Sequence, residues 1–120
     1  MRFLIDANMP RSIIALVESL GHEVEFARDV GLAAALLTRD LDFADVRRYP
    51  PSLYPGIVVL RLPDGVIAKA DIVHVTERFL RDATFVGNLA GRLAIVEQDR
   101  VRFRPALARV ASENLAKKGS

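Results

Sequence analysis

Six short stretches of this chain carry the apolar or alternating pattern that is typical of β-strands. The clearest lies within residues 56–62, where IVVL is continuously apolar, as in a strand that a parallel sheet buries on both faces. The last two stretches flank a tight turn and predict a hairpin. The predicted strands are residues 2–5, 22–28, 33–37, 56–62, 93–97 and 101–104.

Stretches with apolar side chains at helical spacing separate these strands. Residues 10–20 follow a candidate N-cap, Asn8, and end at Gly21, while residues 66–86 have the pattern of one long amphipathic helix. Residues 42–48 predict a short helix that the following pair of prolines ends. Strands that alternate with helices favour an α/β fold with a mostly parallel sheet and helices on both faces.

Length and composition agree with one domain that has its own core. The chain has 120 residues, 51% of them hydrophobic, and no cysteine, which excludes disulfides and thiolate metal sites. It shows neither a signal-peptide pattern nor a long apolar span, so we expect a cytoplasmic protein with no membrane partner. We expect the domain to occupy residues 1–105, and residues 106–120 to form a C-terminal helix or disordered tail.

Aspartates follow two of the predicted strands, where the chemistry of a parallel sheet is expected. Asp6 ends the first strand, and Asp40, Asp42 and Asp45 follow the third. Carboxylates that converge without a cation repel one another, whereas Mg²⁺ or Mn²⁺ favours oxygen ligands and can activate water beside a phosphodiester. The cluster therefore predicts a metal site. The opposing interpretation is that Asp42 and Asn8 only cap helices and that Asp45 stabilises a helix dipole.

Side chains near these aspartates could bind the phosphates of a substrate. Arg39 and Arg47 flank the acidic segment, and Asn8 lies beside Asp6 at a predicted helix start, where phosphate is favoured. The net charge is only +2, so bulk charge alone does not indicate a nucleic-acid partner. For the arginines of the predicted hairpin we favour a different role, since charges on an edge strand discourage pairing with other sheets.

A series of short motifs follows in fixed order along residues 1–105. It begins with FLIDANMP at residues 3–10, which matches the pattern FLxDxNxP. The later segments are GHEV (21–24), RDVGL (28–32), LTRDLDF (37–43), PGIV (55–58) and LRLP (60–63). In these motifs and their order the chain resembles the PIN-like proteins that are predicted to be ribonuclease toxins of bacterial toxin–antitoxin modules.

The resemblance implies a three-layer α/β/α PIN-like domain, with a mostly parallel central sheet and a C-terminal β-hairpin. It implies a divalent-metal-dependent endoribonuclease that acts on RNA and has a cognate antitoxin protein as partner. By motif, Asp6 matches the acid that ends the first strand, and Asp40 and Asp42 match the paired acids of the TxDxDF segment. These three would be catalytic and would bind Mg²⁺ or Mn²⁺, and Thr38 matches the supporting hydroxyl. The predicted substrate-binding residues are Asn8, Thr38, Arg39 and Arg47.

One helix of the family pattern is missing. Family members carry a helix with an acidic start between the RDxGL and LxTxDxDF segments, whereas here residues 31–37 (GLAAALL) run directly on. Residues 29–34 are also too few for a helical crossover between parallel strands, so either the domain is shortened by one helix or the second and third strands are joined in an unusual way. The metal site would then lack one carboxylate, which we do not expect Asp29 to replace.

Two alternatives to an active nuclease remain open. The missing acid favours a catalytically silent PIN-like module that binds a partner or dimerises. Without the helix, one sheet face would be exposed and apolar, so we expect a homodimer through that face. The weaker alternative is a receiver-like phosphoacceptor domain, which needs paired acids after the first strand, and Asp6-Ala7 does not supply them. The retained Asp6 and Asp40 favour the endoribonuclease.

Overall fold

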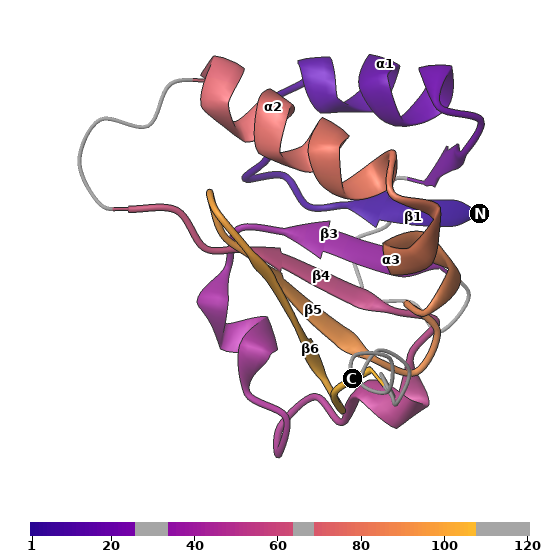
Figure 1. Cartoon of the computed structure of the whole chain (residues 1–120). Helices are drawn as coiled ribbons and strands as arrows, with labels where there is room; N and C mark the ends of the chain where they lie inside the picture. The colour runs from indigo at the N-terminus through magenta and orange to yellow at the C-terminus, as the bar shows by residue number, and fades with distance from the viewer. Residues whose placement is uncertain (26–33, 64–68, 108–120) are drawn as a thin grey trace, which may run out of the picture.

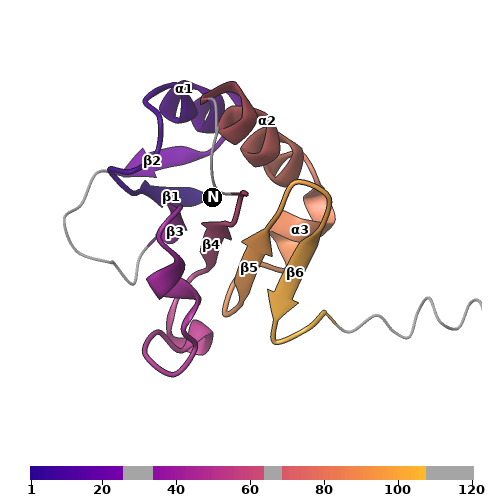
Figure 2. The ribbon, with the colours of Figure 1, turned by 90° about the vertical axis from the view of Figure 1, so that its left-hand side faces the viewer.

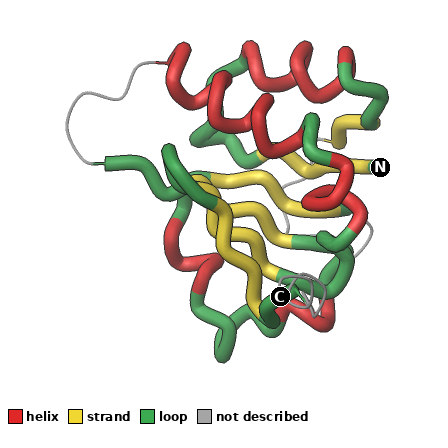
Figure 3. The backbone as a smooth tube through the Cα atoms, viewed as in Figure 1, coloured by secondary structure: helices red, strands yellow, loops and turns green. Residues whose placement is uncertain are grey.

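A six-stranded sheet organises the computed structural model, which describes residues 1–25, 34–63 and 69–107 (Figures 1 and 3). The strands are β1 (Arg2–Ile5), β2 (Glu23–Glu25), β3 (Ala35–Thr38), β4 (Ile57–Leu60), β5 (Leu93–Val96) and β6 (Val101–Arg104). Their order is β2-β1-β3-β4-β5-β6, and all neighbours are parallel except the β5–β6 hairpin. The predicted α/β class, the mostly parallel sheet and the terminal hairpin are therefore confirmed.

Three α-helices cover one face of this sheet: α1 (Ser12–Ser19), α2 (Lys69–Leu80) and α3 (Ala83–Gly87). Figure 1 shows α1 and α2 side by side above the strands. Helix α1 ends where Gly21 was predicted to stop it, because Gly21 adopts φ +91° and its N–H donates to the carbonyl of Glu18. The N–H of His22 donates to the carbonyl of Val17, which completes a Schellman turn. None of the described helices is long and apolar enough to cross a membrane.

The prediction of one long helix over residues 66–86 is wrong. Helix α2 ends at Leu80, and Asp82 starts the separate helix α3. The Asp82 carboxylate accepts hydrogen bonds from the backbone N–H groups of Thr84 and Phe85, at 2.9 and 3.2 Å. Such a cap satisfies the free donors of a new helix start, so the chain turns although the apolar spacing continues. The predicted start of the helix falls in residues 64–68, outside the described residues.

The second face of the sheet is covered by two 3₁₀ turns, η1 (Leu41–Ala44) and η2 (Pro51–Leu53), with the loops around them. Side chains of this segment pack on the sheet, and the strand residues beneath them are at most 8% exposed. Figure 2 shows this magenta segment on the opposite side of the sheet from α2 and α3. The short helix predicted over residues 42–48 is confirmed only as the 3₁₀ turn η1, so among the described residues α-helices lie on one face of the sheet and not on both as predicted. The predicted exposed apolar sheet face is wrong. The homodimer loses its structural basis and stays a prediction.

Strands β2 and β3 flank the short segment for which the sequence left two explanations open, a domain shortened by one helix or an unusual connection. They are not neighbours, because each pairs with a different side of β1. Only residues 26–34 separate them, and residues 26–33 lie outside the described part of the chain. The ends predicted for these strands at residues 26–28 and 33, and most of the predicted tail (108–120), also lie outside it.

Candidate functional site: a carboxylate pair and an arginine cleft

The carboxyl ends of β1, β3, β4 and β5 meet at one edge of the sheet, since these strands are parallel. From β1 the chain moves to β2 on one side, whereas β3, β4 and β5 follow one another on the other side. Ligands of open α/β sheets bind outside the carboxyl ends at such a reversal of strand order. Asp6 follows β1 and Thr38 ends β3, so both residues lie at this point.

The Thr38 side chain links the two strand ends. Its hydroxyl donates a hydrogen bond of 2.6 Å to Oδ2 of Asp6 and accepts one of 3.0 Å from the backbone N–H of Asp40. Thr38 is fully buried, so both the donor and the acceptor of its hydroxyl are used. The N–H of Asp6 donates to the carbonyl of Leu37 at 3.0 Å, which continues the ladder between β1 and β3. Asp6 and Asp40, far apart in the sequence, are thereby held through one hydroxyl.

Asp40, not Asp42, caps the turn that follows β3. Oδ1 of Asp40 accepts a hydrogen bond of 2.9 Å from the backbone N–H of Asp42, at the start of η1. The capping role predicted for Asp42 is therefore wrong, and its side chain is exposed. Asp45 lies after η1 and accepts a hydrogen bond of 3.1 Å from the backbone N–H of Arg47. Of the four candidate carboxylates, Asp40 and Asp45 therefore cap local turns, and the Asp6 carboxylate is bound to the Thr38 hydroxyl.

Asn8 does not cap α1, contrary to the prediction. The residue before this helix is Arg11, and no side chain caps the helix start. Oδ1 of Asn8 instead accepts a hydrogen bond of 3.3 Å from the backbone N–H of Arg39, just beyond β3. Asn8 therefore ties the β1–α1 loop to the chain between Thr38 and Asp40 and supports the carboxylate pair.

The described residues contain no group of three or more acidic, histidine or cysteine side chains placed to hold a metal ion. Asp42 is thus not brought into a three-carboxylate site with Asp6 and Asp40, and Asp29 lies outside the described residues. Asp6 and Asp40 each use one carboxylate oxygen in the hydrogen bonds above and make no other side-chain hydrogen bond within the described segments. Since Mg²⁺ is commonly bound by one or two carboxylates with waters and phosphate, this pair has the chemistry that such an ion requires.

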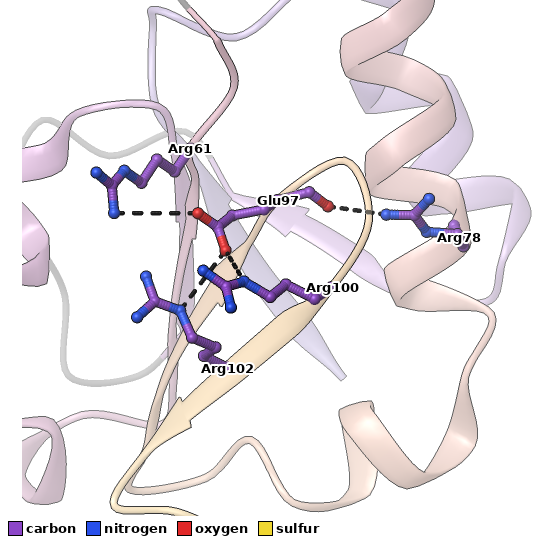
Figure 4. Close-up of polar contacts among 5 residues, drawn as sticks. All are labelled: Arg61, Arg78, Glu97, Arg100 and Arg102. Carbon is purple, nitrogen blue, oxygen red and sulfur yellow. Dashed lines mark hydrogen bonds and ion pairs between the residues drawn. The ribbon is translucent and has the colours of Figure 1, made fainter.

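A second charged group at this edge was not predicted from the sequence. Glu97 follows β5, and three guanidinium groups surround its carboxylate (Figure 4). Nε of Arg100 lies 2.6 Å from Oε1, Nε of Arg102 lies 3.6 Å from the same oxygen, and Nη1 of Arg61 lies 3.9 Å from Oε2. Arg78 of α2 donates a hydrogen bond of 2.8 Å to the backbone carbonyl of Glu97. Arg100 and Arg102 of the hairpin are therefore organised around one acid, whereas Arg104 is exposed, as predicted for a solvated edge charge.

A cleft of about 500 Å³ opens beside Glu97, and we call it the arginine cleft. It is lined by Arg61, Leu62, Pro63, Glu97, Gln98, Asp99 and Arg100. The hydrogen bond from Arg100 and the charges of Arg102 and Arg61 lower the pKa of Glu97, so its carboxylate stays ionised at neutral pH. By contrast, the side chain of Arg47, the predicted phosphate ligand, is 94% exposed. Its Nε lies 4.0 Å from Oδ1 of Asp45.

Glu97→Gln is expected to weaken the fold at neutral pH but not in acid. The folded pKa of Glu97 is lowered from its usual 4.5, so the ionised form stabilises the native state above that value, and the contribution is lost as the pH falls through the folded pKa. Urea denaturation from about pH 7 to about pH 3 should show the difference between wild type and variant shrinking in acid. Glu18→Gln, at an exposed position of α1, is the control. A difference independent of pH would contradict the assignment.

Comparison with protein-family models, curated proteins and solved structures finds no match for this chain.

Proposed function

We propose that this protein is a PIN-like, divalent-metal-dependent endoribonuclease. The observation that carries the proposal is the Thr38 hydroxyl, which links the Asp6 carboxylate to the backbone N–H of Asp40 where the strand order reverses. A bound Mg²⁺ or Mn²⁺ would supply an activated water and offset the negative charge that develops on a phosphodiester. The second element of the proposal is the arginine cleft at the same sheet edge, because a nuclease needs cations for phosphate beside its carboxylates.

The individual residues have distinct roles in this proposal. Asp6 and Asp40 would hold the metal through the oxygens that face away from Thr38 and from Asp42. Thr38 orients Asp6 with a short hydrogen bond, and Asn8 fixes the backbone at Arg39. Such partners matter because the groups that hydrogen-bond to metal ligands set the orientation and affinity of those ligands.

The biological setting follows from the sequence motifs. The PIN-like resemblance supports a toxin that acts on RNA, is neutralised by a cognate antitoxin and works in the cytoplasm. A homodimer belongs to the same proposal. No contact between the described residues bears on the antitoxin or on a second copy of the chain.

A catalytically silent binding module is the second candidate. It is favoured by the number of carboxylates, since the described residues hold no group of three or more that could bind a metal ion. Two carboxylates bind a divalent cation more weakly than three, because each carboxylate adds charge and a ligand. A module of this kind would keep the sheet edge as a binding surface without hydrolysis.

A cleavage assay on single-stranded RNA distinguishes the two candidates. We expect cleavage with Mn²⁺ and none with EDTA. Asp40→Asn should lower the cleavage rate roughly tenfold or more, because the ligand charge is removed while the amide oxygen can still cap η1. No cleavage by either protein would favour the binding module, and equal cleavage by both would show that Asp40 is not part of the nuclease site.

A further inference from the structure

The arginine cleft and the carboxylate pair lie on the same face of the sheet as well as at the same edge. Side chains alternate between the two faces of a strand, so residues two apart share a face. The second-face core residues Leu4, Leu36, Val59 and Ile95 are followed two positions later by Asp6, Thr38, Arg61 and Glu97. Ladder hydrogen bonds continue beyond the strand ends, from Asp6 to Leu37 and from Arg61 to Val96, so the alternation holds there.

The charged side chains at the arginine cleft differ in their exposure to solvent. Three guanidinium groups, those of Arg61, Arg100 and Arg102, surround Glu97. The lining itself is balanced, with Arg61 and Arg100 against Glu97 and the exposed Asp99, and Arg102 adds a third cation beside the cleft. Glu97 is only 17% exposed at its side chain, whereas Arg61 and Arg100 are 56% and 61% exposed. The acid therefore lies beneath the arginines, and the positive groups face the solvent.

Glu97 leaves most of the arginine donors free for a ligand. A guanidinium group has five N–H donors. Arg100 uses Nε toward Glu97, and Arg61 approaches that carboxylate only at 3.9 Å. Neither side chain makes another hydrogen bond within the described segments of the chain. Two guanidinium groups held by one acid, with their outer N–H groups free, match the paired oxygens of a phosphate group.

We propose that the arginine cleft binds a backbone phosphate of the RNA strand that Asp6 and Asp40 cleave, a proposal that rests on the proposed function. Neighbouring strands lie about 4.8 Å apart, so Arg61, which follows β4, is about 10 Å along the edge from Asp6, which follows β1. An RNA chain that follows the edge contacts the carboxylates first and the cleft next. Leu62 and Pro63 give the cleft an apolar wall against which a nucleoside can lie. An acidic peptide would gain no binding energy from having the metal-binding carboxylates and the cleft in line along the edge.

The test measures RNA binding without cleavage. Fluorescence anisotropy of a labelled single-stranded RNA, with full-length protein and EDTA, should show affinity falling on the order of tenfold in the double variant Arg61→Gln/Arg100→Gln. The slope of log affinity against log salt should become shallower by about 0.7 for each phosphate that the variant no longer neutralises. Arg11→Gln, on the other face before α1, should bind as wild type. Arg61→Lys should reduce the affinity in part, because it keeps the charge but not the paired donors.

Binding and cleavage fail in distinguishable ways. Unchanged affinity in a folded double variant, verified by circular dichroism, would overturn the cleft even if the protein cleaves RNA. If the double variant binds RNA more weakly but the wild type never cleaves, the cleft stands as an RNA site and the nuclease proposal falls. A poly-glutamate peptide of matched charge should compete poorly with RNA. Equal competition, with the same weakening in the double variant, would assign the cleft to acidic protein partners and overturn the RNA proposal.

Discussion

Replacing Asp6 by asparagine is expected to lower RNA cleavage about a hundredfold or more and to abolish stabilisation by Mn²⁺. Asp6 directly follows the central strand β1, whereas Asp40 lies in the turn after β3. Oδ2 of Asp6 accepts the short hydrogen bond from the Thr38 hydroxyl. Asparagine keeps the size but removes the charge that a cation requires. The effect should exceed that of Asp40→Asn, because Asp40 also serves as a cap that asparagine retains.

Two measurements check this expectation. The first is the cleavage rate at saturating Mn²⁺, and the second is the shift of the melting temperature when Mn²⁺ is added, which does not depend on activity. Asp71→Asn is the matched control, since Asp71 lies in the exposed first turn of α2 on the opposite face. If Mn²⁺ shifts the melting temperature of Asp6→Asn as much as that of the wild type, Asp6 is not a metal ligand.

Gly56→Ala is expected to destabilise the fold by about 3 kcal/mol, from overpacking together with a strained backbone. Gly56 immediately precedes β4 and has φ +153°, a conformation that other residues rarely adopt. A Cβ atom there would lie 2.5 Å from Cγ of Leu89, which is fully buried and cannot move aside cheaply. The carbonyl of Gly56 accepts a hydrogen bond of 2.9 Å from Leu36, so a shift of this residue would also disturb the pairing of β3 with β4.

Chemical denaturation measures this effect directly. Gly87→Ala is the control, because a Cβ atom at this helical glycine meets no atom within 4 Å and its φ is not positive. It should leave the free energy of unfolding unchanged or raise it slightly, since alanine favours helix. Equal stabilities of the two variants would show that the contact between Gly56 and Leu89 does not limit the packing of β4.

The strands could be predicted from sequence because their signals are local. Apolar runs end at Asp6 and at Thr38, and the continuous run before Arg61 indicated burial on both faces. Helix ends were less predictable. The spacing of apolar side chains continues across Asp82, so only the competing hydrogen bonds of its carboxylate reveal a break. The cover on the second face was also missed, because 3₁₀ turns and loops have no periodicity to recognise.

The candidate site could be predicted where topology alone determines it. Parallel strands bring their carboxyl ends together, and this is sufficient to place Asp6 near Asp40. The capping residues were not predictable, since Asn8 and Asp42 both fit the local pattern of a cap. In the fold, Asn8 instead accepts a hydrogen bond from the backbone N–H of Arg39, which is distant in sequence. The cluster at Glu97 requires knowing that β4, β5 and β6 are neighbours, which no local pattern of arginines reveals.

The strand order also has a consequence for synthesis of the chain. Residues 2–38 contain β1 with both of its partners, and β4 at residues 57–60 pairs with β3 as it emerges from the ribosome. The other edge of β4 pairs with β5, which is translated more than thirty residues later. During that interval the nascent chain holds a bare, wholly aliphatic strand, and such a strand is where premature association begins.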